Sequence, residues 1–596
     1  MPGPESIGPQ AANSVGIVTP ETVQVPVPAG GLELEGGGRL PELTVAFERY
    51  GDLAPDKSNA VYICHALTGD AHVAGYHSPD DPKPGWWDQM VGPGKALDTN
   101  RYHVICANIL GGCKGTTGPG SISPENGKPY GSRFPDITVG DIVRVQHDFL
   151  KHIGIDRLEA VIGGSLGGMQ AIEWAIQFPD AVESCICIAS AMSLSAQALA
   201  FDIVGRRAIT GDPAWAGGDY YETDQVPAPG LSQARMIGHI TYLSPEMMTR
   251  KFGRERRDDK RFQVESYLDY QGGKFVEHFD ANSYLHITKA MDAYDVEEKY
   301  GSVEAALERV RSRCLVVALS SDWLFPPEQS LDLSIALLQA GKDVSYCELL
   351  APHGHDAFLV DIEHLGELVS TFIANLTRAP STTSAPPAAW VTEPWRREED
   401  NLIKRSVKKG SRVLDLGCGN GQILELLARD HEVHGLGVDI ELEHVIDVLG
   451  KGIDIFQADI DEGLAMIPDK AYDYAILSET LQVVRQPRTV LKEMLRVANE
   501  GIVSFPNFAR WRYRAYLTLF GRMPKSRTLP FEWYDTPNIH LTTLKDFLRL
   551  CDQDGYRILD LTCVASGIFG KLLVRLGLKN LGANRVIVRL TRDGSD

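Results

Sequence analysis

The chain has 596 residues, a length that indicates two to four domains because a single hydrophobic core does not grow so large. Its formal net charge of -20 at pH 7 argues against general binding to nucleic acids or to anionic membrane surfaces. Its ten cysteines include no C-x-x-C pair, so we expect no zinc site and no disulfide framework, and a reducing cytoplasm as the location.

The chain begins with a stretch rich in Pro, Gly and Ser, from which we expect a disordered tail over residues 1–30. Strands are expected at 43–50, 60–65 and 102–108. The Gly-rich loop after the third strand, at 111–119, either approaches a ligand closely or is a plain connection.

The stretch that organises the first part of the chain is Gly-Gly-Ser-Leu-Gly-Gly at 163–168. An apolar run at 158–162 precedes it, and a helix expected at 169–178 follows. Strand, tight turn and helix around G-x-S-x-G are the context of a nucleophile elbow, which would expose Ser165. An ordinary Gly-rich turn is the alternative. In an elbow, the backbone amides of Leu67 and Leu166 would form the oxyanion hole.

An acid and a histidine follow later strands. The pattern is helical from about 193 to 310, where a cap inserted into a hydrolase sheet would lie. Strands at 313–319 and 344–350 then lead to Asp322 and His355, with His353 as a competing base. The order Ser165, Asp322, His355 is that of an α/β-hydrolase triad, so residues 31–378 are expected to form an α/β-hydrolase domain with a helical cap.

Residues 379–389 are Pro, Ala and small polar residues with nothing to bury, and 379–392 is expected to be a linker to a domain at 393–596. A strand there enters D-x-G-C-G-x-G, a pattern that favours S-adenosylmethionine over NAD. The α/β fold expected is Rossmann-like, of the class I methyltransferase type. The candidate cofactor residues are Asp415, Gly417, Gly419, Gly421, the ribose-binding acid Asp439, and Asp459 beside the adenine.

Several segments together resemble the homoserine O-acetyltransferase family over residues 43–376. They are 65–69, 84–98, 111–119, 163–170, 234–244, 321–326 and 354–359. The resemblance implies Ser165 as nucleophile, Asp322 as orienting acid and His355 as base. It also implies that Arg235 and Asp356 bind the carboxylate and the ammonium of L-homoserine, with Arg206 as a second candidate cation.

The implied reaction is a double displacement in which acetyl-CoA acylates the serine and homoserine then accepts the acetyl group. It requires no cofactor and no metal. Thr116 is typical of the acetyl-using form, whereas relatives that use succinyl-CoA tend to carry Ser there. The alternatives are a homoserine O-succinyltransferase and a plain esterase or thioesterase.

The segment 393–588 resembles methionine biosynthesis protein W, a methyltransferase-like family, most clearly at 521–540. Fusion to the first part favours a supporting role in methionine synthesis, and the D-x-G-C-G-x-G pattern favours S-adenosylmethionine as the ligand of this domain. Methyl transfer and ligand sensing without turnover both remain open for it. The resemblance of the first part also suggests a homodimer formed through the cap helices.

Overall fold

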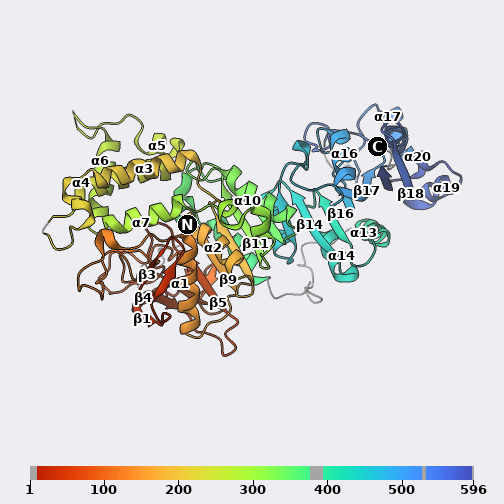
Figure 1. The fold of residues 1–596 in the computed structure, drawn as a ribbon. Coiled ribbons are helices and arrows are strands. Elements are labelled where there is room, and N and C mark those ends of the chain that lie inside the picture. Colours follow the sequence, from red (N-terminus) through yellow and green to blue (C-terminus); the bar gives the residue numbers. More distant parts are fainter. Residues whose placement is uncertain are drawn as a thin grey trace. The chain divides into compact units, whose positions relative to one another are not determined.

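The computed structural model describes residues 8, 10–223, 225–258, 260–375, 394–526 and 532–592, with the side chains of 394–398 excepted. The chain divides into two compact units, Met1–Leu376 and Thr377–Asp596 (Figure 1). The linker expected at 379–392 lies outside the described residues. Among the described residues, no helix has both the length and the apolar character needed to cross a membrane.

The first unit is built on an eight-stranded sheet with the order β1-β4-β8-β5-β9-β10-β11-β12. From β8 onward the neighbouring strands are parallel, while β1 and β4 pair antiparallel at one edge. The strands are β1 Glu21–Val25, β4 Leu43–Tyr50, β5 Ala60–Cys64, β8 His103–Ala107, β9 Ala160–Gly164, β10 Ser184–Ile188, β11 Arg313–Leu319 and β12 Val344–Leu349. Two small pairs, β2 Leu32–Leu34 with β3 Gly38–Leu40 and β6 Val91–Gly92 with β7 Leu97–Asp98, lie outside this sheet.

The expectation of a disordered tail through residue 30 is wrong for its last part. Strand β1 pairs with β4 from Glu21 opposite Phe47 to Val25 opposite Leu43. The segment Thr-Val-Gln-Val within it is rich in β-branched residues, which suit a half-buried edge strand. The Pro- and Gly-rich composition of the first residues therefore does not extend to the sheet.

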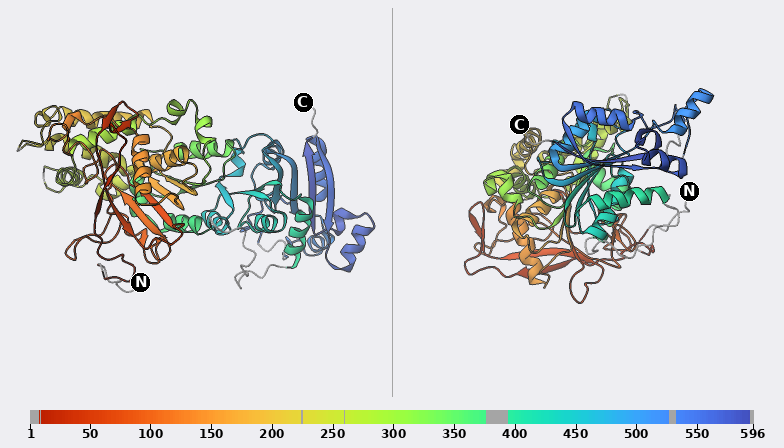
Figure 2. Two further views of the ribbon diagram at one scale, coloured as in Figure 1. Left: turned by 60° about the horizontal axis from the view of Figure 1, so that its bottom comes forward. Right: turned by 90° about the vertical axis from the view of Figure 1, so that its right-hand side faces the viewer.

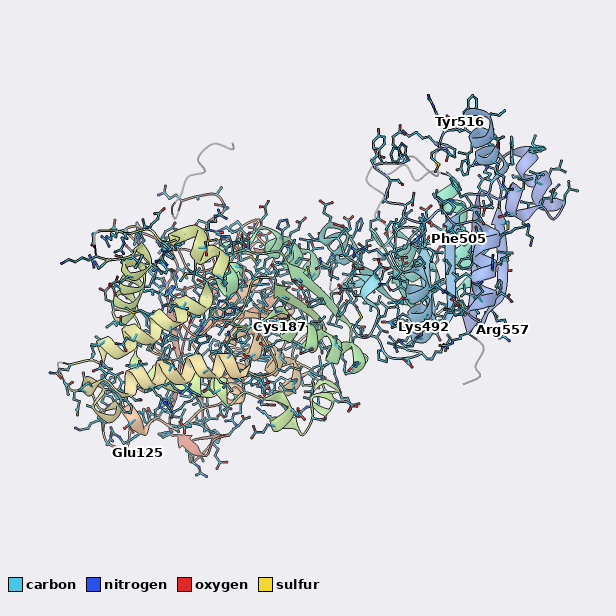
Figure 3. The ribbon with its side chains drawn as sticks, turned by 90° about the horizontal axis from the view of Figure 1, so that it is seen from above. Glu125, Cys187, Lys492, Phe505, Tyr516 and Arg557 are labelled. Atoms are coloured by element: carbon cyan, nitrogen blue, oxygen red, sulfur yellow. The ribbon has the colours of Figure 1, made fainter. Side chains whose placement is uncertain are left out.

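The central strands are buried on both faces because helices cover the sheet on either side (Figures 1 and 2). Every residue of β5, β8, β9 and β10 is buried, and Figure 3 shows Cys187 of β10 among these strands. The flanking helices are α1 Val139–His152, α2 Leu166–Gln177, α10 Pro327–Gln339, α11 Ala357–Val360 and α12 Glu363–Ala374. The α1 helix begins with a capping box between Thr138 and Asp141.

A helical cap is inserted between β10 and β11, where the sequence predicted it. Its helices α3 and α4 pack on each other, as do α4 and α6 (Figure 1). The cap helices are α3 Ala196–Thr210, α4 Ala228–Tyr242, α5 Pro245–Phe252, α6 Gln263–Val276, α7 Ala281–Asp292, α8 Val296–Tyr300 and α9 Val303–Leu307.

The second unit has a seven-stranded sheet with the order β15-β14-β13-β16-β17-β19-β18. The first five are parallel, and β19 and β18 form an antiparallel pair beyond β17. The strands are β13 Arg412–Leu416, β14 His434–Asp439, β15 Asp454–Gln457, β16 Tyr472–Ser478, β17 Ala498–Pro506, β18 Tyr556–Val564 and β19 Arg585–Arg592. The helices are α13 Pro394–Ser406, α14 Gln422–His431, α15 Leu442–Leu449, α16 Pro487–Val497, α17 Trp511–Phe520, α18 Leu544–Gln553, α19 Gly567–Arg575 and α20 Lys579–Gly582.

The chain leaves β13 toward β14 and β15 and then returns to β16 on the other side of β13. This reversal is the topological switch point at which doubly wound sheets bind ligands, and it confirms the predicted fold class. In Figure 3, Phe505 marks β17, and the ring of Phe505 packs on that of Phe547 in the core. Tyr516 marks the exposed side of α17.

Candidate active site

Ser165 stands at a strained turn between β9 and α2. Its backbone has φ 59° and ψ -126°, a conformation that side chains rarely adopt. A Cβ on Gly163 would come within 2.2 Å of the Gly167 backbone, and one on Gly167 within 2.1 Å of the Cys64 carbonyl oxygen. Because only glycine fits at both positions, this turn has the geometry of a nucleophile elbow.

Asp322 and His355 meet at the ends of β11 and β12. The Nδ1 atom of His355 lies 2.6 Å from Oδ2 of Asp322, and both side chains are buried. The other carboxylate oxygen of Asp322 accepts hydrogen bonds from the amides of Leu324 and Phe325, at 3.0 and 2.9 Å. The carboxylate is therefore fixed in the orientation that holds the imidazole.

Burial alone would lower the pKa of His355, but the charge of Asp322 and its hydrogen bond outweigh burial, so the pKa of His355 is raised. The competing His353 faces another acid, with Nδ1 3.6 Å from Oδ2 of Asp361. The geometry thus pairs Asp322 with His355 and leaves His353 outside the pair.

A cavity opens above Ser165. The rings of Phe325 and Tyr242 line it together with Ser165, and both also pack on the His355 ring, at centroid distances of 5.2 and 6.1 Å. The structure therefore brings Ser165, Asp322 and His355 to one site under the cap.

The amides expected in the oxyanion hole belong to two segments that one side chain ties together. Nε2 of Gln170, a buried residue of α2, donates to the carbonyl oxygens of His65 and Leu166, both at 3.1 Å. Leu67 lines the cavity. Within the part of the chain that the structure describes, the amides of Leu67 and Leu166 donate no hydrogen bond, so both are free to meet an oxyanion.

Arg235, on the cap helix α4, reaches the loop after β5. Its Nη1 donates to the Thr68 hydroxyl at 3.1 Å, and its guanidinium lies over the rings of Phe275 and Tyr242. Asp356 follows His355 directly. Burial raises the pKa of Asp356, although the charges of His355 and Arg235 oppose this. A cation and an acid thus lie within electrostatic range of each other and of the histidine.

The sequence reasoning missed Asp202, which lines the same cavity from α3. Burial and the charge of Asp292 raise the pKa of Asp202 to about 8, despite the nearby Arg206. Arg206, the second candidate cation, instead forms an ion pair with Asp292. The spacing of Asp202 and Arg206 places them on one helix face, but nothing in the sequence shows that this face borders the cavity.

In the second unit, the expected cofactor residues gather at the carboxyl ends of β13 and β14. Gly417, Gly419 and Gly421 all have positive φ, and a Cβ on Gly419 would meet open space. Oδ2 of Asp439 accepts from the Gly419 amide at 2.8 Å, and Oδ1 accepts from His444 at 2.9 Å.

The remaining two expected cofactor residues, Asp415 and Asp459, have different surroundings. Burial and the charges of Asp439 and Asp400 raise the pKa of Asp415 to about 7, so this acid is a buried neighbour of the loop. Asp459 caps the short helix η4 Ile460–Glu462 through the Asp461 amide. Sequence reasoning missed His444, whose spacing of five residues from Asp439 on the next helix is the only signal.

Family models match both units. The model of the alpha/beta hydrolase fold matches residues 59–362, and the model of methionine biosynthesis protein MetW matches residues 397–583.

Three curated relatives cover different shares of the chain. The bifunctional methionine biosynthesis protein MetXA/MetW of Rhodopirellula baltica is 42% identical over 88% of this chain and 86% of its own. A homoserine O-acetyltransferase of Methanosalsum zhilinae is 50% identical over 58% of this chain and 71% of its own. A homoserine O-succinyltransferase of Acidithiobacillus ferrooxidans is 49% identical over 61% of this chain and 97% of its own.

Among solved structures, a homoserine O-acetyltransferase from Bacillus anthracis matches with a TM-score of 0.57 and 30% identity, over 62% of this chain and all of that one. Esterase E22 matches almost as well, with a TM-score of 0.56 and 29% identity over 60% of this chain and all of that one. The fold of the first unit is thus shared by a transferase and a hydrolase, whereas the bifunctional protein of Rhodopirellula baltica is similar over both units. The chain belongs to the family of bifunctional MetXA/MetW methionine biosynthesis proteins.

Proposed function

We propose that the first unit is a homoserine O-acetyltransferase, which converts acetyl-CoA and L-homoserine into O-acetyl-L-homoserine and CoA. The observation that carries this proposal is the capped cavity lined by Ser165, Tyr242 and Phe325, because the rings of Tyr242 and Phe325 pack on His355 of the Asp322–His355 pair. A cap with Arg235 and Asp356 beside that pair favours an amino-acid acceptor over water.

In the first half-reaction, His355 takes the proton of Ser165 while the serine oxygen attacks the thioester carbonyl carbon. The negative charge that develops on the carbonyl oxygen is stabilised by the Leu67 and Leu166 amides. The carbon–sulfur bond then breaks, and the CoA thiolate takes the proton from His355. Asp322 stabilises the imidazolium that exists between these two transfers.

In the second half-reaction, His355 takes the proton of the homoserine hydroxyl, whose oxygen attacks the acetyl-serine carbonyl carbon. The bond from carbon to the serine oxygen breaks, and Ser165 regains its proton from His355. The planar guanidinium of Arg235 would bind the α-carboxylate, and Asp356 would bind the α-ammonium. Asp202, at the same cavity, is a second carboxyl group that could face the ammonium.

Replacing Arg235 with lysine is expected to raise the KM for homoserine by about 10- to 100-fold, because a bidentate contact to a carboxylate contributes about 1.5–3 kcal/mol. The rate of serine acetylation by acetyl-CoA alone should change little. Steady-state kinetics with varied homoserine check the first effect, and the exposed Arg207→Lys on α3 is the matched control. An unchanged KM would remove Arg235 from the acceptor site.

The acyl donor is argued from the cavity lining. A succinyl group would bring a second carboxylate, yet none of the residues that line this described cavity is a Lys, Arg or His that could pair with it. This lining favours the acetyl group. The Thr116 hydroxyl accepts a hydrogen bond from the Ala46 amide of β4. Its side chain therefore gives no contact-based reason to prefer acetyl over succinyl.

The test of the double displacement is the mass of the intact protein after mixing with acetyl-CoA alone. We expect one acetyl group per chain, discharged within one turnover by homoserine and much more slowly by water. Loss of the acetyl group at the same rate with and without homoserine would support the esterase alternative. The structural similarity to esterase E22 is consistent with that alternative.

We further propose that the second unit binds S-adenosylmethionine at the loop of Gly417, Gly419 and Gly421 and supports methionine synthesis. The open space beside Gly419 fits a ligand against the backbone, and Asp439, which holds this loop, retains acceptor capacity for ribose hydroxyls. When bound, the cofactor would supply a methyl group or a regulatory signal.

Asp439→Ala is expected to weaken S-adenosylmethionine binding by about 10- to 100-fold, since it removes acceptors for the ribose as well as the Gly419 anchor. Isothermal titration calorimetry on the full chain measures this effect. The exposed Asp447→Ala on α15 serves as the control. Equal affinities of the two variants would refute this location.

We also propose a homodimer formed through the cap, in the cytoplasm. Exposed apolar side chains on α3, α4 and α6 support the dimer: Ile203, Val204, Ile240 and Tyr270. All ten cysteines are free, as expected in a reducing compartment. Sedimentation equilibrium of the full chain gives the assembly mass that checks the dimer.

A further inference from the structure

Two histidines converge on one carboxylate in the first unit, away from the Asp322–His355 pair. Oε2 of Glu48, on β4, lies 3.0 Å from Nδ1 of His72, and Oε1 lies 2.7 Å from Nε2 of His77. Both histidines belong to the loop after β5. Their rings are 3.8 Å apart between centroids, and the three ligand atoms lie within 4.8 Å of one another.

The cluster is closed on one side and open on the other. The side chain of Glu48 is only 3% exposed, that of His72 is 18% exposed and that of His77 is 42% exposed. Burial would raise the pKa of Glu48, but its bonds to His72 and His77 outweigh burial, so the pKa of Glu48 is lowered. A buried anion with two imidazoles thus faces solvent through His77.

We propose that Glu48, His72 and His77 form a binding site for a zinc-type divalent cation. Two imidazoles and one carboxylate are a common three-ligand set for zinc, and such sites hold water in the fourth position. The net charge of this set with two neutral imidazoles is -1, which suits a dication. The sequence predicted no zinc site because it has no C-x-x-C pair, whereas these ligands are a glutamate of β4 and two histidines of the loop after β5.

The cation would replace the protons that now lie between the histidines and the carboxylate. Ligand atoms about 2.1 Å from a tetrahedral zinc ion are about 3.4 Å apart, so the three ligand atoms, which lie within 4.8 Å of one another, would rearrange around the ion. The Tyr50 hydroxyl, 2.9 Å from Oε2 of Glu48, is positioned to orient the carboxylate behind the ion.

The effect of the cation would be to fasten the loop of His72 and His77 to β4. The same loop contains Leu67 and Thr68 near its start, and the Thr68 hydroxyl accepts a hydrogen bond from Arg235. A ligand that binds the folded state and not the unfolded state raises the unfolding temperature. The cation is therefore expected to stabilise the first unit.

The experiment is a calorimetric titration of the tag-free, EDTA-treated full chain with Zn²⁺, repeated with Co²⁺ to record its visible spectrum. We expect one ion per chain with micromolar or tighter affinity, and a tetrahedral Co²⁺ spectrum. His77→Ala should weaken Zn²⁺ binding by at least about 100-fold, and Tyr50→Phe by about 10-fold. The exposed His152→Ala on α1 should bind like the unchanged chain.

His77→Ala decides the outcome, because its exposed ring is not needed for the core, whereas Glu48→Gln could unfold the edge of the sheet. Zn²⁺ should raise the unfolding temperature of the unchanged chain and of His152→Ala, but not that of His77→Ala. Equal Zn²⁺ affinity in His77→Ala and His152→Ala, or affinity no better than millimolar, would overturn the proposal. The cluster would then be a hydrogen-bonded clamp that holds the loop on β4.

Discussion

Replacement of Ser165 by alanine is expected to lower homoserine-dependent CoA release by about a million-fold, because loss of the nucleophile removes the covalent pathway. The fold should survive, since alanine removes only the hydroxyl, and the glycines that permit the close packing of this turn stay in place. The measurement is thiol release monitored with a chromogenic reagent, together with the unfolding temperature. No acetyl group should appear on the intact variant.

Ser58→Ala, at an exposed position of the same unit, is the control and should keep full activity. If Ser165→Ala retained a tenth of the activity with a normal unfolding temperature, direct transfer from acetyl-CoA to homoserine would replace the acetyl-enzyme pathway.

Replacement of Asp322 by asparagine is expected to lower kcat by about ten thousand-fold, since the amide no longer stabilises the imidazolium or fixes the tautomer of His355. The pH dependence should also change. In the unchanged chain the raised pKa of His355 places the acid limb of kcat/KM above the ordinary histidine value of about 6.5. Without the charge and hydrogen bond of Asp322, the lowering of the pKa by burial is opposed by the weaker effect of the Asp356 charge, so the limb should move to lower pH.

Asp361→Asn is the matched control, because Asp361 faces the competing His353. This variant should leave both kcat and the acid limb unchanged. A larger loss in Asp361→Asn than in Asp322→Asn would reassign the base to His353, and an unmoved limb in Asp322→Asn would show that the limb reports another group.

The parts of the site that the sequence predicted are those carried by local patterns. The elbow at Ser165 depends on glycines within five residues, and Asp322 and His355 each follow a strongly apolar strand in a fixed chain order. Parallel strands bring such strand ends to one edge of the sheet, so local patterns and topology together were sufficient. The cap was predicted because a hundred helical residues interrupt the strand pattern between β10 and β11.

The parts that the sequence could not predict depend on contacts between distant segments. The expected tail ended too late because β1 is short and is stabilised by its pairing with the distant strand β4. Asp202 borders the cavity through the packing of the cap, and Gln170 joins the loop after β5 to α2 through its amide. Thr116 belongs to a segment that matches the family, but its side chain contacts β4.

The central claim is that the Ser165 site transfers an acetyl group to homoserine. The most direct test is thiol release from acetyl-CoA and from succinyl-CoA in parallel, each with and without homoserine, using the purified full chain. We predict homoserine-dependent release with kcat/KM favouring acetyl-CoA. Preference for succinyl-CoA would keep the mechanism and contradict the acetyl assignment, and release that does not depend on homoserine would contradict the transferase itself.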